Sequence, residues 1–189
     1  MRELSLNVMD IAQNSIEAHS TLIKIQVCEN TRKNRLTIEI SDNGVGIDKN
    51  NLKKIFSPFY TTRKSRKVGL GIPLFKMAAE ATGGGLRIHS DQNTGTTVTA
   101  TFVTSSIDMT PLGDINSTIA ILIKCNPKVD FIFTHIIDDS SLTLNTLEIK
   151  KELGNNIGIQ EALVVTWIQK YLAEQTQLLL GGTAYNEIT

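Results

Sequence analysis

Two stretches near the N-terminus alternate apolar and polar residues, and this alternation constrains the fold more than any other feature of the chain. In the first stretch, Ile23, Ile25 and Val27 are separated by polar residues, and residues 36–40 repeat the pattern after a polar turn at residues 30–34. A period of two is typical of strands that bury one face and leave the other face in water. We therefore expect a β-hairpin in a sheet that is covered on one side.

Helical periodicity precedes and follows this hairpin. Residues 4–19 place apolar side chains on one stripe and polar side chains on another, and a second amphipathic helix is predicted over about residues 70–82. Residues 86–90 and 96–103 are then predicted to form a second pair of strands. Antiparallel strand pairs separated by helices favour an α/β fold, a two-layer α/β sandwich in which helices cover one face of a mixed, mostly antiparallel sheet.

The balance of charge changes along the chain, which suggests two units. Residues 1–103 hold 14 Lys and Arg against 9 Asp and Glu, whereas residues 104–189 hold 5 against 10. The polar stretch 104–111 lies where the sign changes and is the expected linker. We expect one domain over 1–103 and a small acidic α+β domain over 112–189. Its predicted elements are a helix over 115–124 capped by Asp114, a strand over 129–137, and helices over 148–153 and 160–180.

Composition is that of a soluble globular protein, with 41% hydrophobic and 20% charged residues. No apolar run is long enough to cross a bilayer and the N-terminus does not resemble a signal peptide, so we expect a cytoplasmic protein without membrane contact. The basic excess of the first half is too small to indicate a nucleic-acid partner. Cys28 and Cys125 lie in apolar runs and are expected to be buried, reduced thiols.

Three polar residues share one face of the first predicted helix. Asp10, Asn14 and Glu17 are spaced i, i+4 and i+7, which brings them within about 60° of one another on a helix of 3.6 residues per turn. The amide oxygen of Asn14 could complete the coordination of a Mg²⁺ ion that is chelated by phosphates. The carboxylate of Asp10 could orient or deprotonate a nucleophile beside it. Taken alone, this spacing is explained better by a solvent-exposed helix face than by a ligand-binding site.

A glycine-bearing loop follows the second strand of the hairpin. Its sequence over residues 41–47 is SDNGVGI, so Asp42 stands at the strand end, where its carboxylate could accept a hydrogen bond from an exocyclic amine such as that of adenine. Gly44 and Gly46 would let the backbone bend and approach a flat base closely. Alone, Asp-Asn-Gly is a common turn sequence.

Glycines also precede the second long helix. Gly69, Leu70 and Gly71 lead into its first turn, where free N–H groups and the positive end of the helix dipole would face a phosphate. Arg63 and Lys64 belong to the basic run before this turn. Such a run, taken alone, is more commonly a basic surface loop.

In this order and at these distances, the segments resemble the motifs of the GHKL superfamily, the histidine-kinase-like ATPases with the Bergerat fold. The matching segments are residues 6–18 for the N box, 42–47 for the G1 box, 55–63 for the F box of histidine kinases, 69–72 for the G2 box, and Gly95-Thr96-Thr97 for the last nucleotide-contacting turn. The resemblance covers about residues 3–103 and implies a site for ATP and Mg²⁺.

The resemblance also implies roles for single residues. Asn14 would bind Mg²⁺, Asp42 would accept a hydrogen bond from the adenine amino group, and Thr96 would support Asp42 through a water molecule. Gly69 and Gly71 would approach the phosphates, which Arg63 or Lys64 would cover.

Asp10 occupies the position of the catalytic base, where hydrolysing members generally carry Glu and histidine kinases more often carry Asn. Its shorter side chain would move the carboxylate by about 1 Å, and a displacement of that size can cost on the order of 10²-fold in rate.

Three functions are compatible with these motifs. The first is a kinase-like module that transfers the γ-phosphoryl group to a partner protein, since His19, His89 and His135 are each expected to be structural. The second is an ATP-hydrolysing conformational switch of the gyrase B and MutL kind, and the third is a nucleotide sensor without turnover. The partner contact would lie in the acidic C-terminal region or in a homodimer. Trp167, Ile168, Tyr171 and Leu172 fall on one side of the last predicted helix, where the core is favoured over a dimer contact.

Overall fold

A computed structural model describes residues 3–48, 52, 55, 70–154 and 156–181 of the chain. Its elements are, in chain order, α1 (Leu4–Glu17), β1 (Leu22–Asn30), β2 (Arg35–Asp42), α3 (Gly71–Ala81), β3 (Gly85–Asp91), β4 (Gly95–Val103), α4 (Ile115–Cys125), β5 (Asp130–Ile137), β6 (Ser140–Asn145), α5 (Thr146–Leu153) and α6 (Ala162–Leu179).

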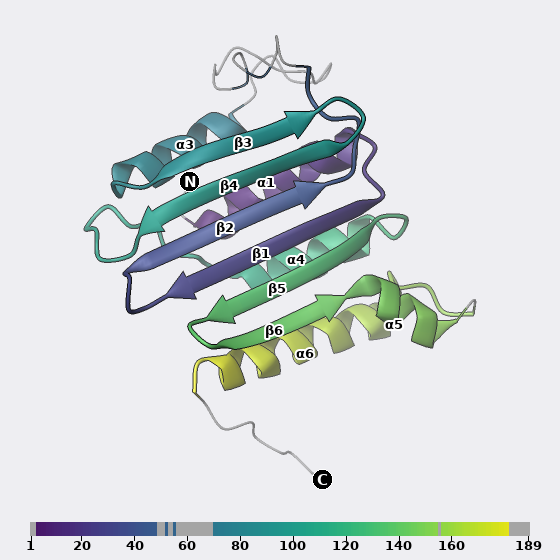
Figure 1. The fold of residues 1–189 in the computed structure, drawn as a ribbon. Helices are drawn as coiled ribbons and strands as arrows, with labels where there is room; N and C mark the ends of the chain where they lie inside the picture. The colour runs from purple at the N-terminus through teal and green to yellow at the C-terminus, as the bar shows by residue number, and fades with distance from the viewer. Residues whose placement is uncertain (1–2, 49–51, 53–54, 56–69, 155, 182–189) are drawn as a thin grey trace.

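The strands form one six-stranded sheet in the order β3-β4-β2-β1-β5-β6. Neighbouring strands are antiparallel except β1 and β5, which run parallel. Helices α1, α3, α4 and α6 lie behind the sheet in Figure 1, and α5 lies at its end beside β6. The prediction of a two-layer α/β sandwich with a mixed, mostly antiparallel sheet is therefore confirmed.

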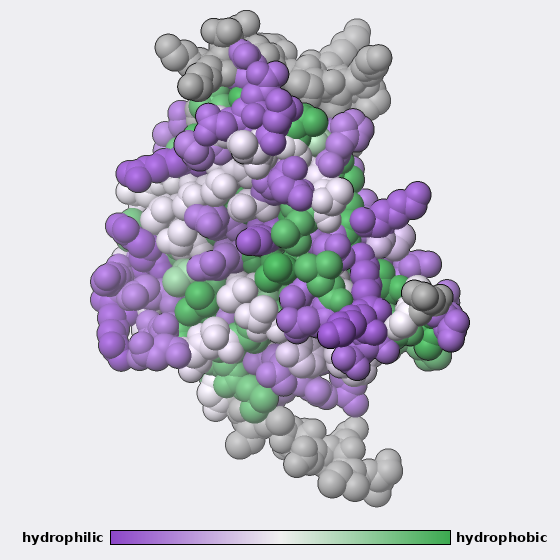
Figure 2. Space-filling model, turned by 45° about the vertical axis from the view of Figure 1, so that its right-hand side comes forward, coloured by the Kyte–Doolittle hydropathy of each residue, from purple (hydrophilic) through white to green (hydrophobic). Residues whose placement is uncertain are grey.

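Burial follows the alternation in the sequence. Ile23, Ile25 and Val27 of β1 are buried under the helices, as are the matching residues of β2. The other face of the sheet carries no described helix, and Figure 2 views it obliquely as a mostly hydrophilic or neutral surface with a smaller apolar area near its middle. The wet face predicted from the polar positions is thus present.

The C-terminal half does not build a sheet of its own. Strand β5 pairs with β1 along its whole length, and Phe131 and Phe133 are buried in the same core as Phe75 and Phe102. The segment 104–111, which was expected to link two domains, connects elements of one sheet. The backbone carbonyls of residues 111–112 accept hydrogen bonds from the first N–H groups of α1. The change of charge sign had suggested a separate unit. The net charge of a segment, however, carries no information about which strand β5 pairs with.

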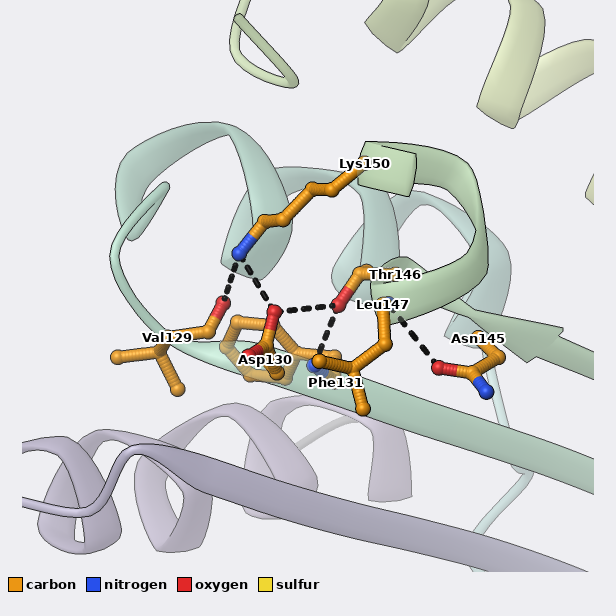
Figure 3. Close-up of polar contacts among 7 residues, drawn as sticks. All are labelled: Val129, Asp130, Phe131, Asn145, Thr146, Leu147 and Lys150. Carbon is orange, nitrogen blue, oxygen red and sulfur yellow. Dashed lines mark hydrogen bonds and ion pairs between the residues drawn. The ribbon is translucent and has the colours of Figure 1, made fainter. Parts of the chain in front are cut away.

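Helix α5 is fixed to the start of β5 by a polar cluster, shown in Figure 3. The ammonium group of Lys150 donates to Asp130 Oδ1 at 2.6 Å and to the carbonyl of Val129 at 3.3 Å. The hydroxyl of the fully buried Thr146 accepts a hydrogen bond from the N–H of Phe131 at 2.8 Å and lies 3.4 Å from Asp130 Oδ1. The cluster satisfies a strand N–H that would otherwise be buried without a partner.

Three findings differ from the expectations. Strand β6 was not predicted, the free thiol of Cys125 is exposed, and the free thiol of Cys28 in β1 is only half-buried. Ile168 and Leu172 of α6 lie in the core, whereas Trp167 of the same helix is exposed.

The predicted cap of α4 is confirmed, because Asp114 Oδ1 accepts a hydrogen bond from Ser117 N at 2.9 Å. In the part of the chain that is described, no helix combines the length and apolarity needed to cross a membrane.

Candidate functional site

Three polar side chains form a row across the ends of β2, β4 and β3. Thr96 is paired with Asp42 on one side and with Ser90 on the other, so all three share the face of the sheet that the helices cover. The buried hydroxyl of Ser90 donates to the carbonyl of Gly95 at 2.9 Å and lies 2.9 Å from Thr96 Oγ1. It also accepts a hydrogen bond from Ile47 N at 2.8 Å. Ser90 therefore ties the loop after Asp42 to the start of β4.

The carboxylate of Asp42 is held at both oxygens. Ser15 of α1 donates its hydroxyl to Asp42 Oδ2 at 2.6 Å, and the N–H of Gly44 donates to Asp42 Oδ1 at 2.9 Å. Each carboxylate oxygen can accept more than one hydrogen bond, so this arrangement orients the group and leaves acceptor capacity for an incoming donor. Asp42 is partly exposed, which makes that capacity accessible.

Asn43, the residue after Asp42, anchors the loop to the start of β1. Its Oδ1 accepts hydrogen bonds from the N–H groups of Thr21 and Leu22, both at 2.9 Å, and its Nδ2 donates to Thr21 Oγ1 at 2.8 Å. The loop is anchored again where Val45 N donates to the carbonyl of Ala18 at 3.0 Å. These contacts fix the loop that carries Asp42 against the end of α1.

The two glycines of the loop are needed for contact with the protein itself. A Cβ on Gly44 would lie 2.6 Å from the carbonyl oxygen of Ala18 and 2.7 Å from Ser20 Oγ. Gly46 has a φ of 69°, and a Cβ there would overlap the carbonyl of Asp91. Close approach to a flat base was the reason expected from the sequence. The contacts give another: the loop packs between the end of α1 and the turn after β3.

Helix α1 meets the beginning of α3 beside this row. A Cβ on Gly71 would lie 3.2 Å from Asp10 Cβ and 3.7 Å from Asp10 Oδ2, so the glycine lets the first turn of α3 approach Asp10. Asn14 lies one turn further along α1 and directly precedes Ser15. Leu70, the residue before α3, is exposed at the same place.

The structure thus brings together most of the predicted site residues. They are Asp10, Asn14, Asp42, Gly44, Gly46, Leu70, Gly71 and Thr96. Arg63, Lys64 and Gly69 lie outside the described residues, as does nearly all of the segment 55–63. Within the described part of the chain, no three His, Cys, Asp or Glu side chains gather in a way that could hold a metal.

Two residues of the site were not predicted, Ser15 and Ser90. Each is a polar residue at a position where the periodicity predicts burial. Ser15 lies on the apolar stripe of α1, and Ser90 lies on the same face of β3 as Ile88. A buried hydroxyl needs a hydrogen-bond partner, so a serine on an apolar stripe is a signal that could have marked both.

The family model described as histidine kinase-, DNA gyrase B-, and HSP90-like ATPase matches residues 1–106. The chain belongs to this ATPase family. The row at the strand ends, the glycine loop and both site helices lie within the matched residues, and β5, β6, α5 and α6 follow them.

Similar proteins agree with this assignment. The sensor protein kinase WalK of Staphylococcus haemolyticus is 37% identical over 91 residues, which cover 46% of this ATPase-family chain and 15% of WalK. WalK of Staphylococcus aureus is 36% identical over 97 residues, covering 49% of the chain and 23% of that sequence. The alignments thus span less than a quarter of these relatives. A crystal structure of the N-terminal domain of a DNA repair protein has a TM-score of 0.56 at 17% identity and covers 77% of this chain and 53% of that one, which shows the shared fold.

Proposed function

We propose that this ATPase-family chain binds ATP with Mg²⁺ at the row of Asp42, Thr96 and Ser90 and transfers the γ-phosphoryl group to a partner protein. The observation that carries the proposal is the carboxylate of Asp42, fixed at one oxygen by Ser15 and at the other by the N–H of Gly44. A carboxylate held in this way is a pre-organised acceptor for an exocyclic amine, and adenine presents such an amine.

The remaining residues fit the other parts of the nucleotide. Asn14 supplies an amide oxygen to Mg²⁺, which neutralises phosphate charge when it is bound. Helix α3 begins at Gly71, its N-cap residue Leu70 makes no side-chain hydrogen bond to the helix, and Asp10 lies directly against Gly71. Arg63, Lys64 and Gly69 are proposed to contact the phosphates, and Thr96 to support Asp42.

Transfer to a second protein is supported by the surroundings of two histidines. His135 is buried, with Nε2 2.8 Å from Glu29 Oε1, and is therefore not presented to a nucleotide. His89 is next to Ser90 in β3, so its side chain points to the opposite face of the sheet from Asp42. The similarity to sensor protein kinases favours phosphotransfer over other fates of the γ-phosphate.

A conformational switch driven by hydrolysis is the second candidate. It is favoured by the contact between Asp10 and Gly71, because a carboxylate at the start of α3 could position a water molecule near the phosphates. A sensor that binds ATP without turnover would share the same pocket and differ only in the chemistry that follows.

Binding is tested by titration calorimetry with Mg²⁺-ATP on the wild type, Asp42→Asn and Glu39→Gln. Glu39 is the matched control, since it lies in the same strand on the opposite face and contacts Thr99. We expect Asp42→Asn to weaken ATP binding at least tenfold and Glu39→Gln to leave it within twofold. Equal affinities for all three proteins would reject the pocket.

The fate of the phosphate is tested by incubation with γ-labelled ATP, with and without cell extract. A labelled protein that appears only with extract supports phosphotransfer, whereas release of inorganic phosphate by the chain alone supports the switch. Tight binding with neither product would contradict both and leave the sensor.

A further inference from the structure

The hydroxyl of Ser90 makes three contacts, and two of them fix the direction of the third. Ser90 Oγ lies 2.9 Å from the carbonyl oxygen of Gly95, 2.8 Å from Ile47 N and 2.9 Å from Thr96 Oγ1. A carbonyl oxygen only accepts hydrogen bonds and a backbone N–H only donates them, whereas a hydroxyl donates one and accepts two. The direction of the contact between the two hydroxyls therefore follows from the other two contacts.

The single hydroxyl hydrogen of Ser90 goes to the carbonyl of Gly95, because that oxygen has no hydrogen of its own to offer. One lone pair of Ser90 Oγ accepts the N–H of Ile47, and the other is left for the hydroxyl of Thr96. This direction satisfies all three contacts of a buried group, whereas the reverse direction leaves two oxygens facing each other without a hydrogen. Thr96 is therefore the donor to Ser90.

The packing around Ser90 leaves little room for another arrangement. Gly95 has a φ of 111°, and a Cβ there would overlap the carbonyl of Asp42, so β4 begins directly against the end of β2. On the other side, Gly46 lies against the carbonyl of Asp91, the residue after Ser90. Strand β4 lies between β3 and β2 in Figure 1, so these contacts hold all three strand ends together. The direction of the bond from Thr96 is set before a ligand arrives.

A hydroxyl that donates its hydrogen to Ser90 offers only lone pairs to any other neighbour. Thr96 lies opposite Asp42 in the pairing of β4 with β2, where side chains on one face are about 4.5–5.5 Å apart at Cβ, and both residues are partly exposed. The carboxylate of Asp42 also only accepts. A water molecule between the two groups would give one hydrogen to each and turn its own lone pairs outward. In either case a ligand meets neighbouring acceptors.

We propose that Ser90 is a positioning residue of the nucleotide site and that, through the hydroxyl of Thr96, it makes the site select an exocyclic amino group over an exocyclic oxo group. This inference rests on the proposed binding of ATP at the row of Asp42, Thr96 and Ser90. The amino group of adenine carries two hydrogens and matches two neighbouring acceptors. The oxo group of hypoxanthine or guanine has lone pairs only, so it finds no hydrogen at Asp42 or Thr96.

The test is titration calorimetry of the wild type and Ser90→Ala with Mg²⁺-ATP and Mg²⁺-ITP. The base of ITP differs from adenine in its oxo group and in a hydrogen on the adjoining ring nitrogen. The wild type should prefer ATP by on the order of 10²-fold, since the oxo group is left without a partner. In Ser90→Ala the hydroxyl of Thr96 is free to turn and donate to the oxo group, while Asp42 accepts the ring N–H. The preference for ATP should therefore fall about tenfold.

The matched control is Thr82→Val, at the opposite end of β4. Thr82 is as buried as Ser90, and its hydroxyl also donates to a backbone carbonyl, that of Ala79 at 2.8 Å, and accepts a backbone N–H, that of Val103 at 3.0 Å. This variant loses similar hydrogen bonds and should keep the wild-type preference for ATP. A fall confined to Ser90→Ala is then not a general effect of removing a buried hydroxyl.

Two further variants separate positioning from stability. Ser90→Cys keeps nearly the same size but replaces the hydroxyl with a weak donor and acceptor, so it should lower the preference as Ser90→Ala does. Thr96→Val should also lower it, and adding Ser90→Ala to Thr96→Val should change it no further, because Ser90 acts through Thr96.

The proposal is overturned if Ser90→Ala and Ser90→Cys keep the wild-type preference, if Thr82→Val lowers it equally, or if Ser90→Ala lowers it further in the Thr96→Val background. In each of these cases ATP still binds and the proposed function stands. A wild type that binds neither nucleotide overturns both proposals.

Discussion

Replacement of Ser15 by alanine tests whether α1 positions the carboxylate of Asp42. The substitution removes a buried hydroxyl that donates to Asp42 Oδ2 at 2.6 Å, and the N–H of Gly44 then remains as the only protein donor described at that carboxylate. Hydrogen bonds to charged groups contribute roughly 1.5–3 kcal/mol, and partial exposure of Asp42 places this one near the lower limit. A loss of about 1.4 kcal/mol is a factor of ten in affinity.

We therefore expect Ser15→Ala to weaken Mg²⁺-ATP binding about tenfold in titration calorimetry. Its matched control is Ser5→Ala, because Ser5 is equally buried in the same helix and its hydroxyl donates to Glu3 Oε2 at 3.2 Å, away from the site. If both variants bind ATP as the wild type does, or if both lose affinity equally, the hydroxyl of Ser15 does not position Asp42.

Three further predictions concern stability and are measured by urea unfolding. Gly46→Ala should lower the free energy of unfolding by about 2 kcal/mol or more because of its positive φ and the neighbouring carbonyl, whereas Gly85→Ala, where a Cβ meets nothing within 4 Å, should not. Thr146→Val should cost about 1–3 kcal/mol, since it leaves the N–H of Phe131 without its partner; an unchanged midpoint would contradict this. The backbone N–H and side chain of Ser117 hold the pKa of Asp114 below its ordinary value of 3.8. Asp114→Ala should therefore cost about 1 kcal/mol above pH 5, and the difference from the wild type should vanish as the pH falls through that lowered pKa. A difference that persists at low pH would show another cause.

Local patterns predicted local structure. The alternation of β1 and β2 was sufficient because each strand pairs with its neighbour in the chain, and burial follows from a period of two. Asp114 was recognisable as a helix cap because capping involves residues only three positions apart.

Contacts between distant residues were not predictable in this way. The pairing of β1 with β5 joins residues more than one hundred positions apart, and no periodicity states which edge a strand will join. The contacts of Gly44 were not predictable for the same reason, since the atoms that exclude a Cβ belong to Ala18 and Ser20 at the end of another element. The sequence places Ser15 on the apolar stripe of its helix. Its hydrogen bond to Asp42, which is 27 positions away in the chain, is evident only from the structure.

The position of β1 between β2 and β5 has a consequence for how this protein can be divided. A fragment ending at residue 106, where the family match ends, would remove β5 and leave β1 as a sheet edge, with Phe131 and Phe133 no longer covering the neighbouring core. An exposed strand of that length is a template for pairing between molecules. We therefore expect the segment that ends at residue 106 to aggregate when it is produced alone, because the strand that protects β1 extends from Asp130 to Ile137.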